Sequence, residues 1–127
     1  MRLALDTNAY SAAARGEAKA VALVRAADRL TLPFIVLAEL RAGFAVGAAG
    51  RRNEAALTRF LASSRVDVRY PDEQTTHHYA SVFAQLRRQG TPIPTNDIWI
   101  AALVLQHDLV LLTEDAHFSN VPQIARA

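Results

Sequence analysis

Apolar and polar positions divide the chain into two alternating kinds of segment. Short apolar runs that suit buried β-strands recur at 3–5, 29–32, 66–70 and 109–112. Between them lie longer stretches with apolar residues at helical spacing, at 9–14, 17–27, 33–45, 51–64, 72–89 and 96–107. Strands alternating with helices predict an α/β fold, with a mostly parallel central sheet of four or five strands flanked by helices. A fifth, short edge strand would lie near Ile124.

Turn-forming and polar residues mark several expected element boundaries. Pro33 suits the first turn of the third helix, and Asp72 suits the N-cap of the long helix that ends near Gly90. Thr95 can cap the helix that follows. Because this last helix is apolar nearly all round, we expect it to be buried, with Trp99 in the core.

Composition narrows the classes of function. The chain has 127 residues, of which 51% are hydrophobic, so we expect one compact domain over residues 1–127 with a substantial core. It has no cysteine, which excludes thiolate metal sites and a cysteine nucleophile and fits a reducing cytoplasm. The apolar stretch 98–105 is shorter than the roughly 20 residues that span a bilayer. Asp6 interrupts the first apolar run, so we expect neither a membrane span nor a signal peptide.

The basic residues are almost all arginines. Lys19 is the only lysine among 14 basic residues, and the formal net charge is +2. Arginine binds phosphate and carboxylate through a planar fork, so such a surface suits RNA or acidic partners. Compositional bias in an alanine-rich chain explains the same pattern equally well, so charge alone does not assign a function.

Four carboxylates stand at positions where a solvated surface charge is unusual. Asp6 and Asp115 each follow a buried strand, Glu39 lies on the apolar stripe of a helix, and Asp97 is in the first turn of the buried helix. Singly, the three aspartates could be helix caps or dipole partners. Glu39 is harder to explain, because an unpaired buried glutamate is costly.

Together, these acids predict a metal site. Ligands of parallel α/β sheets bind beyond the carboxyl ends of the strands, and the fold can bring all four acids to that edge. Ionised carboxylates at such short range need a cation, and an all-oxygen donor set indicates Mg²⁺ or Mn²⁺. Sites of this kind bind phosphate oxygens and promote attack by water. We expect His117 to support this site rather than to bind the metal directly.

Four segments in this order resemble the PIN-domain family, specifically the VapC-type toxins of bacterial toxin–antitoxin pairs. They are Leu5-Asp6-Thr7-Asn8, residues 36–43 around Glu39, residues 95–102 around Asp97, and residues 111–118 around Asp115. The resemblance implies a cytoplasmic endoribonuclease that depends on Mg²⁺, with Mn²⁺ able to substitute. Such an enzyme cleaves structured RNA, either tRNA or rRNA, and so inhibits translation.

The resemblance also assigns roles to residues and implies partners. The catalytic residues would be Asp6, Glu39, Asp97 and Asp115, with Asp6, Asp97 and Asp115 holding the metal. Polar support would come from Thr7, Asn8, Asn96 and Thr113. The implied partners are the RNA substrate, a VapB-type antitoxin and a second copy of the chain, with no membrane contact.

Two alternatives stay open at the level of sequence. A different Mg²⁺-dependent phosphohydrolase or receiver fold would want a lysine beyond a later strand, and Lys19 is too early; the phosphatase would also want an aspartate where Asn8 stands. A catalytically inactive PIN-fold binding module would have no need of all four acids. The ribonuclease interpretation therefore accounts for more of the sequence than either alternative.

Overall fold

A parallel four-stranded sheet forms the centre of the computed structural model, which covers residues 1–127. The strands are β1 (Arg2–Leu5), β2 (Arg29–Pro33), β3 (Val66–Arg69) and β4 (Val110–Leu112), in the order β3-β2-β1-β4. All three strand pairings are parallel, which confirms the predicted α/β fold. The expected fifth strand near Ile124 is reduced to a single parallel bridge between Leu111 and Arg126.

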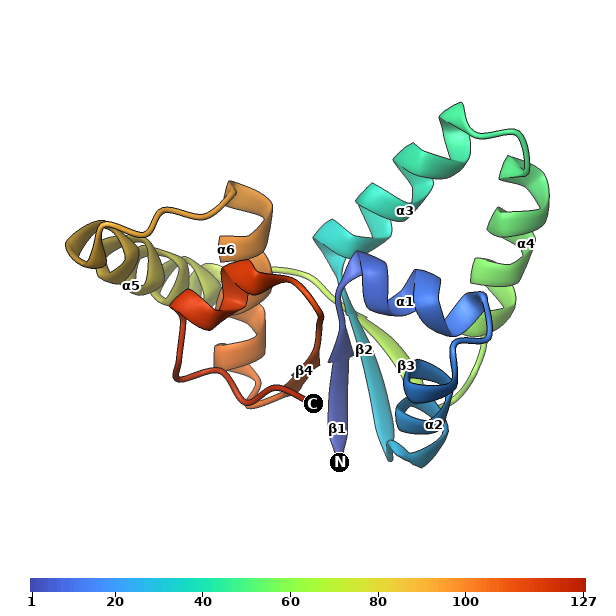
Figure 1. Ribbon diagram of the computed structural model, residues 1–127, viewed down its shortest axis with the longest axis horizontal. Coiled ribbons are helices and arrows are strands. Elements are labelled where there is room, and N and C mark those ends of the chain that lie inside the picture. The colour runs from blue at the N-terminus through green and yellow to red at the C-terminus, as the bar shows by residue number, and fades with distance from the viewer.

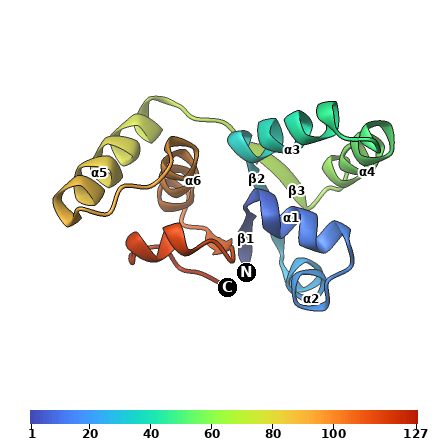
Figure 2. The same cartoon turned by 45° about the horizontal axis from the view of Figure 1, so that its top comes forward.

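Helices cover both faces of the sheet (Figures 1 and 2). One face carries α1 (Thr7–Ala14), α2 (Ala18–Ala26), α3 (Phe34–Val46) and α4 (Gly50–Leu61). The other carries α5 (Glu73–Gln89) and α6 (Thr95–Gln106), and a short 3₁₀ helix, η1 (Ala116–Asn120), follows β4. None of these helices combines the length and the apolar character needed to cross a membrane.

The sheet has a switch in strand order beside β1. The chain leaves β1 for β2 on one side, whereas β4 returns to pair with β1 on the other side. The crossovers on either side of this point lie on opposite faces of the sheet, so the loops after β1 and β4 diverge. Ligands of open α/β sheets bind in the crevice that this arrangement leaves beyond the strand ends.

The core lies between the sheet and its helices. Leu3, Leu5 and Leu111 in the central strands are completely buried. As predicted, α6 is buried along most of its length, because it is packed between the sheet and α5. Trp99 departs from the prediction: it is only half-buried, and its ring contacts Phe34 and Tyr79 in a row of aromatic side chains.

Three helix starts differ from the sequence prediction. Pro33 ends β2 and precedes α3, which begins at Phe34, rather than lying in its first turn. The first helix begins at Thr7 rather than Ala9, because the Asp6 carboxylate caps it by accepting the Ala9 N–H at 2.8 Å. Thr95 does not cap α6. The Pro94 carbonyl instead accepts the N–H groups of Asp97 and Ile98, so Thr95 already lies within the first turn. Asp72 does cap α5, as predicted.

Candidate active site

Asp6 stands at the carboxyl end of β1, opposite Thr113 after β4. The strand register pairs Leu5 with Leu112, so the next residue on each strand faces the other. The Thr113 hydroxyl donates a short hydrogen bond to Asp6 Oδ2, and Asp6 Oδ1 accepts the Ala9 N–H at 2.8 Å. The Asp6 side chain is thereby fixed in one orientation at the strand ends.

Burial dominates the electrostatics of Asp6. The residue is only 6% exposed, and this desolvation raises the pKa of its carboxyl above the ordinary value. The hydrogen bonds from Thr113 and Ala9 oppose that rise, whereas the nearby charges of Asp115 and Glu39 add to it. Asp6 therefore carries its negative charge at a cost in the absence of a cation.

Glu39 lies in the second turn of α3 and is held by two side chains from other elements. Thr7 Oγ1 donates to its Oε1 at 2.6 Å, and Asn96 Nδ2 donates to its Oε2 at 3.2 Å. The sequence suggested a buried glutamate without a partner, but the structure gives it a half-buried position with both carboxylate oxygens hydrogen-bonded. These bonds join the first turns of α1 and α6 to α3.

Asp97, Asp115 and His117 form the third part of the cluster. His117 Nδ1 lies 2.8 Å from Asp97 Oδ2 and 3.2 Å from Asp115 Oδ1. Asp115 is oriented by two backbone contacts: its own N–H donates to Thr113 Oγ1, and its Oδ1 accepts the His117 N–H, each at 2.9 Å. Potential ligand atoms of all three residues lie within 4.8 Å of one another.

The acids of the cluster act on one another. Burial is the main cause of a raised pKa at Asp97, with smaller contributions from the charges of Asp115 and Glu39, while the hydrogen bond with His117 opposes the rise. The same hydrogen bond with Asp97 raises the pKa of His117. The charges of Asp115 and Glu39 thus act on both Asp6 and Asp97, whereas only Asp97, Asp115 and His117 bring potential ligand atoms within 4.8 Å of one another.

Three of the four predicted supporting residues contact one of the four predicted acids. Thr7 and Asn96 bond to Glu39, and Thr113 bonds to Asp6. Asn8 is exposed and lines an adjoining hollow of about 260 Å³ instead. His117, which the sequence predicts to support the site rather than to bind the metal, contacts Asp97 and Asp115. Its two-residue spacing from Asp115 was the available signal, because the 3₁₀ turn brings both side chains to one point.

The donor set of Asp97, Asp115 and His117 fits a divalent cation. Its carboxylate oxygens are hard ligands of the kind that Mg²⁺ and Mn²⁺ bind, with one imidazole beside them. None of the four acids forms an ion pair with a lysine or arginine; the arginines that do pair bind other acids, such as Glu17, Glu54 and Asp67. No lysine or arginine therefore neutralises the negative charge of the acids, and this charge is available to a metal ion.

Comparisons with known proteins identify the family of the chain. A model of the PIN domain matches residues 3–124. Ribonuclease VapC1 of Haemophilus influenzae (strain R2866) is 41% identical over 90 residues, which are 69% of this chain and 64% of that relative. The tRNA(fMet)-specific endonuclease VapC of Salmonella typhimurium is 33% identical over 98 residues, covering 76% of this chain and 73% of that protein.

A solved structure extends the likeness to the whole fold. VapBC-1 from nontypeable Haemophilus influenzae matches with a TM-score of 0.86 and 32% identity, covering 100% of this chain and 97% of the matched one. The alignment to the Haemophilus ribonuclease spans just under two thirds of that protein's length, so the family, rather than the whole activity, is what it establishes. The chain belongs to the PIN-domain family, with VapC ribonucleases among its relatives.

Proposed function

We propose that the protein is a metal-dependent endoribonuclease of the VapC type, the toxin of a toxin–antitoxin pair, which cleaves structured RNA and so inhibits translation. The observation that carries the proposal is the gathering of Asp6, Glu39, Asp97 and Asp115, none of them paired with a lysine or arginine, at the switch point of the sheet. Relatives named as ribonuclease and as a tRNA-specific endonuclease support RNA as substrate, with tRNA or rRNA as the expected targets.

The ion would be Mg²⁺, with Mn²⁺ able to substitute, held by Asp6, Asp97 and Asp115. When bound, it supplies positive charge to phosphate oxygens and makes water a better nucleophile. The chain's own residues do the positioning. Thr113 fixes Asp6 and Asp115 relative to each other, because its hydroxyl donates a hydrogen bond to Asp6 and accepts one from the backbone N–H of Asp115.

Glu39 completes the arrangement from the side of α3. Its hydrogen bonds to Thr7 and Asn96 hold it beside Asp6 and Asp97, the residues that precede and follow those two donors. In this role Glu39 orients water next to the ion-binding acids. The chemistry is hydrolysis: water adds across a phosphodiester bond, and one strand leaves with a free hydroxyl.

The proposed partners follow from the same surface. A VapB-type antitoxin would inhibit the enzyme by placing an arginine against the acids, because a guanidinium pairs with carboxylates through two parallel hydrogen bonds. The Haemophilus structure that matches this chain is a VapBC, which supports a partner of this type.

A homodimer is proposed through an aromatic row beside the site. Rings of Tyr70, Phe34, Trp99, Tyr79 and Phe83 follow one another at centroid distances of 6.4, 6.2, 4.4 and 6.4 Å. The row is open at both ends, where Tyr70 is 64% exposed and Phe83 45% exposed. Exposed aromatic side chains that cluster in this way are typical of protein interfaces.

The test is cleavage of RNA by the purified protein. Labelled tRNA and a ribosomal RNA fragment are incubated with Mg²⁺, with Mn²⁺ and with excess EDTA, and the products are mapped by their ends. We expect defined cuts with either metal and none with EDTA. Undiminished cleavage in EDTA would exclude a metal-dependent mechanism, and the absence of cleavage on every RNA would favour the catalytically inactive binding module.

A further inference from the structure

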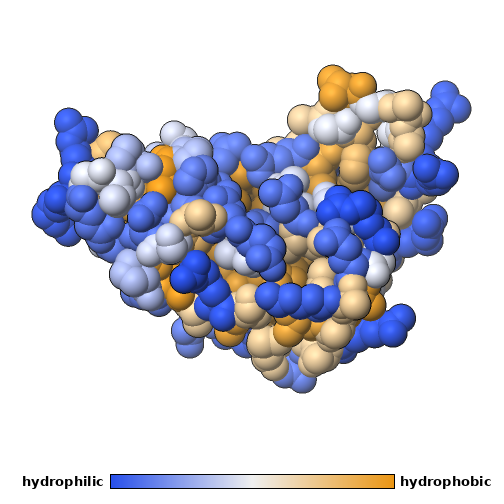
Figure 3. Space-filling model, viewed as in Figure 1, coloured by the Kyte–Doolittle hydropathy of each residue, from blue (hydrophilic) through white to orange (hydrophobic).

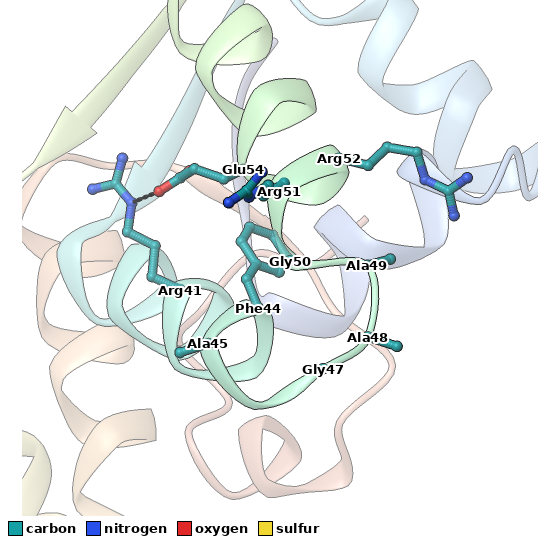
Figure 4. A pocket seen from close by; sticks show the side chains of 10 residues that line it. All are labelled: Arg41, Phe44, Ala45, Gly47, Ala48, Ala49, Gly50, Arg51, Arg52 and Glu54. Carbon is teal, nitrogen blue, oxygen red and sulfur yellow. Dashed lines mark hydrogen bonds and ion pairs between the residues drawn. The ribbon is translucent and has the colours of Figure 1, made fainter.

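The hollow between α3 and α4 has an excess of positive charge. It has a volume of about 1050 Å³ and is lined by Arg41, Arg51 and Arg52, with Glu54 as its only acid. Figure 4 shows Arg41 and Arg52 extended on opposite sides of this hollow, with Arg51 between them. Arg41 Nε donates to Glu54 at 2.8 Å, which leaves two positive charges uncompensated.

Within the hollow, Arg51 and Arg52 are the two arginines without a carboxylate partner. Arg15, Arg29 and Arg69 are all paired with a carboxylate, whereas Arg51 and Arg52 bond to no other side chain and are exposed. They also lie in the first turn of α4, where the helix dipole disfavours cations and no acidic residue offsets them. Two adjacent positive charges at this position destabilise the helix. Their presence is explained if they bind an anionic ligand.

The floor of the hollow allows a polymer backbone to approach closely. It consists of small residues at 47–50, between the end of α3 and the start of α4. A Cβ at Gly50 would lie 2.4 Å from the Phe44 carbonyl oxygen, so the two helices meet in a tight and fixed junction. The guanidinium groups therefore project from a rigid corner rather than from a loose loop.

The corner formed by residues 47–50, between α3 and α4, is on the same side of the molecule as the four acids of the candidate site. Figure 1 shows α3 running from the carboxyl edge of the sheet, where it holds Glu39, to the tip at which the chain turns into α4. At about 1.5 Å per residue, the seven residues from Glu39 to Val46 span roughly 10 Å. In Figure 3, hydrophilic side chains line the saddle between the α5–α6 side and the α3 tip.

We infer that Arg51 and Arg52, with Arg41, bind backbone phosphates of the RNA a few nucleotides from the bond that is cut. The inference rests on the proposed ribonuclease function and names a second contact for its substrate. The phosphates of each strand of a double helix recur about every 3.4 Å along the helix axis, so the roughly 10 Å of α3 between Glu39 and its tip corresponds to about three steps. Guanidinium forks match phosphate oxygens, and contacts of this kind fix register without reading sequence.

The experiment compares two double variants that each remove two positive charges. The test variant is Arg51→Gln with Arg52→Gln, and the matched control is Arg87→Gln with Arg88→Gln, a second pair of adjacent exposed arginines without ion pairs, in the last turn of α5. Figure 1 places α5 at the opposite end of the molecule from the α3 tip. Binding to a tRNA transcript is measured in EDTA over a series of NaCl concentrations, and kcat and KM are measured with Mg²⁺.

We expect the test variant to bind tRNA about tenfold more weakly at low salt, with a salt-dependence slope smaller by roughly 1–2. The loss in kcat/KM should appear mainly in KM, because the acids are untouched. The control variant should keep the wild-type slope. An Arg51→Lys, Arg52→Lys variant should recover most of the slope, since lysine keeps the charge but not the fork.

Each other outcome overturns the inference in a distinguishable way. Equal affinities and slopes for the test, control and wild-type proteins, with wild type active, would remove the phosphate contact but leave the nuclease proposal standing. An unchanged RNA slope combined with loss of a co-purifying protein would assign the corner to an acidic protein partner instead. A wild-type protein that neither binds nor cleaves RNA would end the proposed function and this inference together.

Discussion

His117 Nδ1 lies 2.8 Å from Oδ2 of Asp97, which joins the 3₁₀ helix after β4 to the first turn of α6. The same nitrogen is 3.2 Å from Asp115 Oδ1, so one imidazole contacts two acids of the cluster. Side chains that hydrogen-bond to metal ligands fix their orientation and tune affinity for the ion. His117 thus has a part in the site whether it binds the ion or only orients Asp97.

His117→Ala should weaken metal binding more than it slows the reaction. Loss of such a contact typically costs 10–100-fold in affinity or activity, so we expect the Mg²⁺ concentration for half-maximal RNA cleavage to rise by about that factor. Saturating Mg²⁺ should restore most of the rate. The control is His77→Ala, an exposed histidine on α5. An unchanged Mg²⁺ requirement would mean that His117 has no role at the site.

Asp97→Asn should abolish RNA cleavage while leaving the fold intact. Asparagine keeps the shape of the side chain but removes the charge that the ion needs. The matched control is Asp108→Asn, the same chemical change at an exposed residue whose φ of 52° suits asparagine. The measurement is the initial rate of RNA cleavage by each variant with Mg²⁺. Activity of Asp97→Asn equal to that of Asp108→Asn would remove Asp97 from the site.

Asp72→Ala should destabilise the protein above pH 4 and make less difference in strong acid. Asp72 caps α5, accepts a hydrogen bond from Gln106 Nε2 at 2.9 Å, and has its pKa lowered by that bond first and by the Thr75 N–H next. Because the pKa of Asp72 is lower in the folded state, its ionised carboxylate stabilises the fold at pH values above the unfolded-state pKa. This stabilisation is lost as pH falls through the folded-state pKa. We expect the Tm to fall by a few degrees at pH 7.

Asp72→Asn is the informative comparison, because asparagine also caps helices well. It should melt close to wild type at pH 7 and show a weaker dependence on acid. Thermal melts of the three proteins between pH 2 and pH 7 test this, with the pH range chosen around the ordinary carboxyl pKa of 3.8. A gap between wild type and Asp72→Ala that is as large at pH 2 as at pH 7 would mean that charge contributes nothing to the cap, because the protonated carboxyl still accepts hydrogen bonds.

Phe83→Ser should disrupt the proposed homodimer. The Phe83 ring is 45% exposed and stacks on Tyr79 at the open end of the aromatic row, so a serine there removes apolar contact area without making a cavity in the core. Light scattering after size-exclusion chromatography measures the mass. Val46→Ser is the control, since Val46 is 90% exposed and lies outside the row. A wild-type monomer would contradict the dimer proposal outright.

Much of the fold could be read from the sequence because its signals are local. The apolar runs of β1 and β4 and the all-round apolar character of α6 each demand burial, whatever the neighbours are. Boundaries were less certain, because they depend on which carbonyl or carboxylate satisfies the first N–H groups of a helix. Thr95 had the right chemistry for a cap, but the Pro94 carbonyl already served that purpose.

The sequence shows which acids follow strands, but it does not show which hydrogen-bond partner each acid has. Asp6 and Asp115 end strands, and that placement is visible in the pattern of the chain. The bond between Glu39 and Asn96 joins residues 57 positions apart, and no periodicity encodes such a pair. For the same reason, the sequence could not reveal that Thr7 and Asn96 satisfy Glu39 or that His117 turns towards Asp97.

Asp6→Asn should stabilise the metal-free protein near neutral pH. Burial raises the pKa of Asp6, so the folded state binds more protons than the unfolded chain as pH passes upward from 3.8. Folding stability then declines as pH rises through the folded pKa, and the ionised carboxylate carries its full cost above it. Asparagine avoids this cost and can still accept the Ala9 N–H. The expected gain is about 0.5–2 kcal/mol, as for other relaxed functional sites.

Thermal melts in EDTA and in saturating Mg²⁺ separate this effect from a general change in packing. In EDTA, the Tm of wild type should fall more steeply than that of Asp6→Asn as pH rises above the ordinary carboxyl pKa of 3.8, although Asp97, whose pKa is also raised, keeps some slope in both proteins. Mg²⁺ should raise the Tm of wild type by mass action and close the gap, because it binds only the folded, charged site. If Asp6→Asn instead melts below wild type in EDTA and wild type does not respond to Mg²⁺, the negative charge of Asp6 is already compensated within the protein. The acids would then be a structural network rather than a metal site.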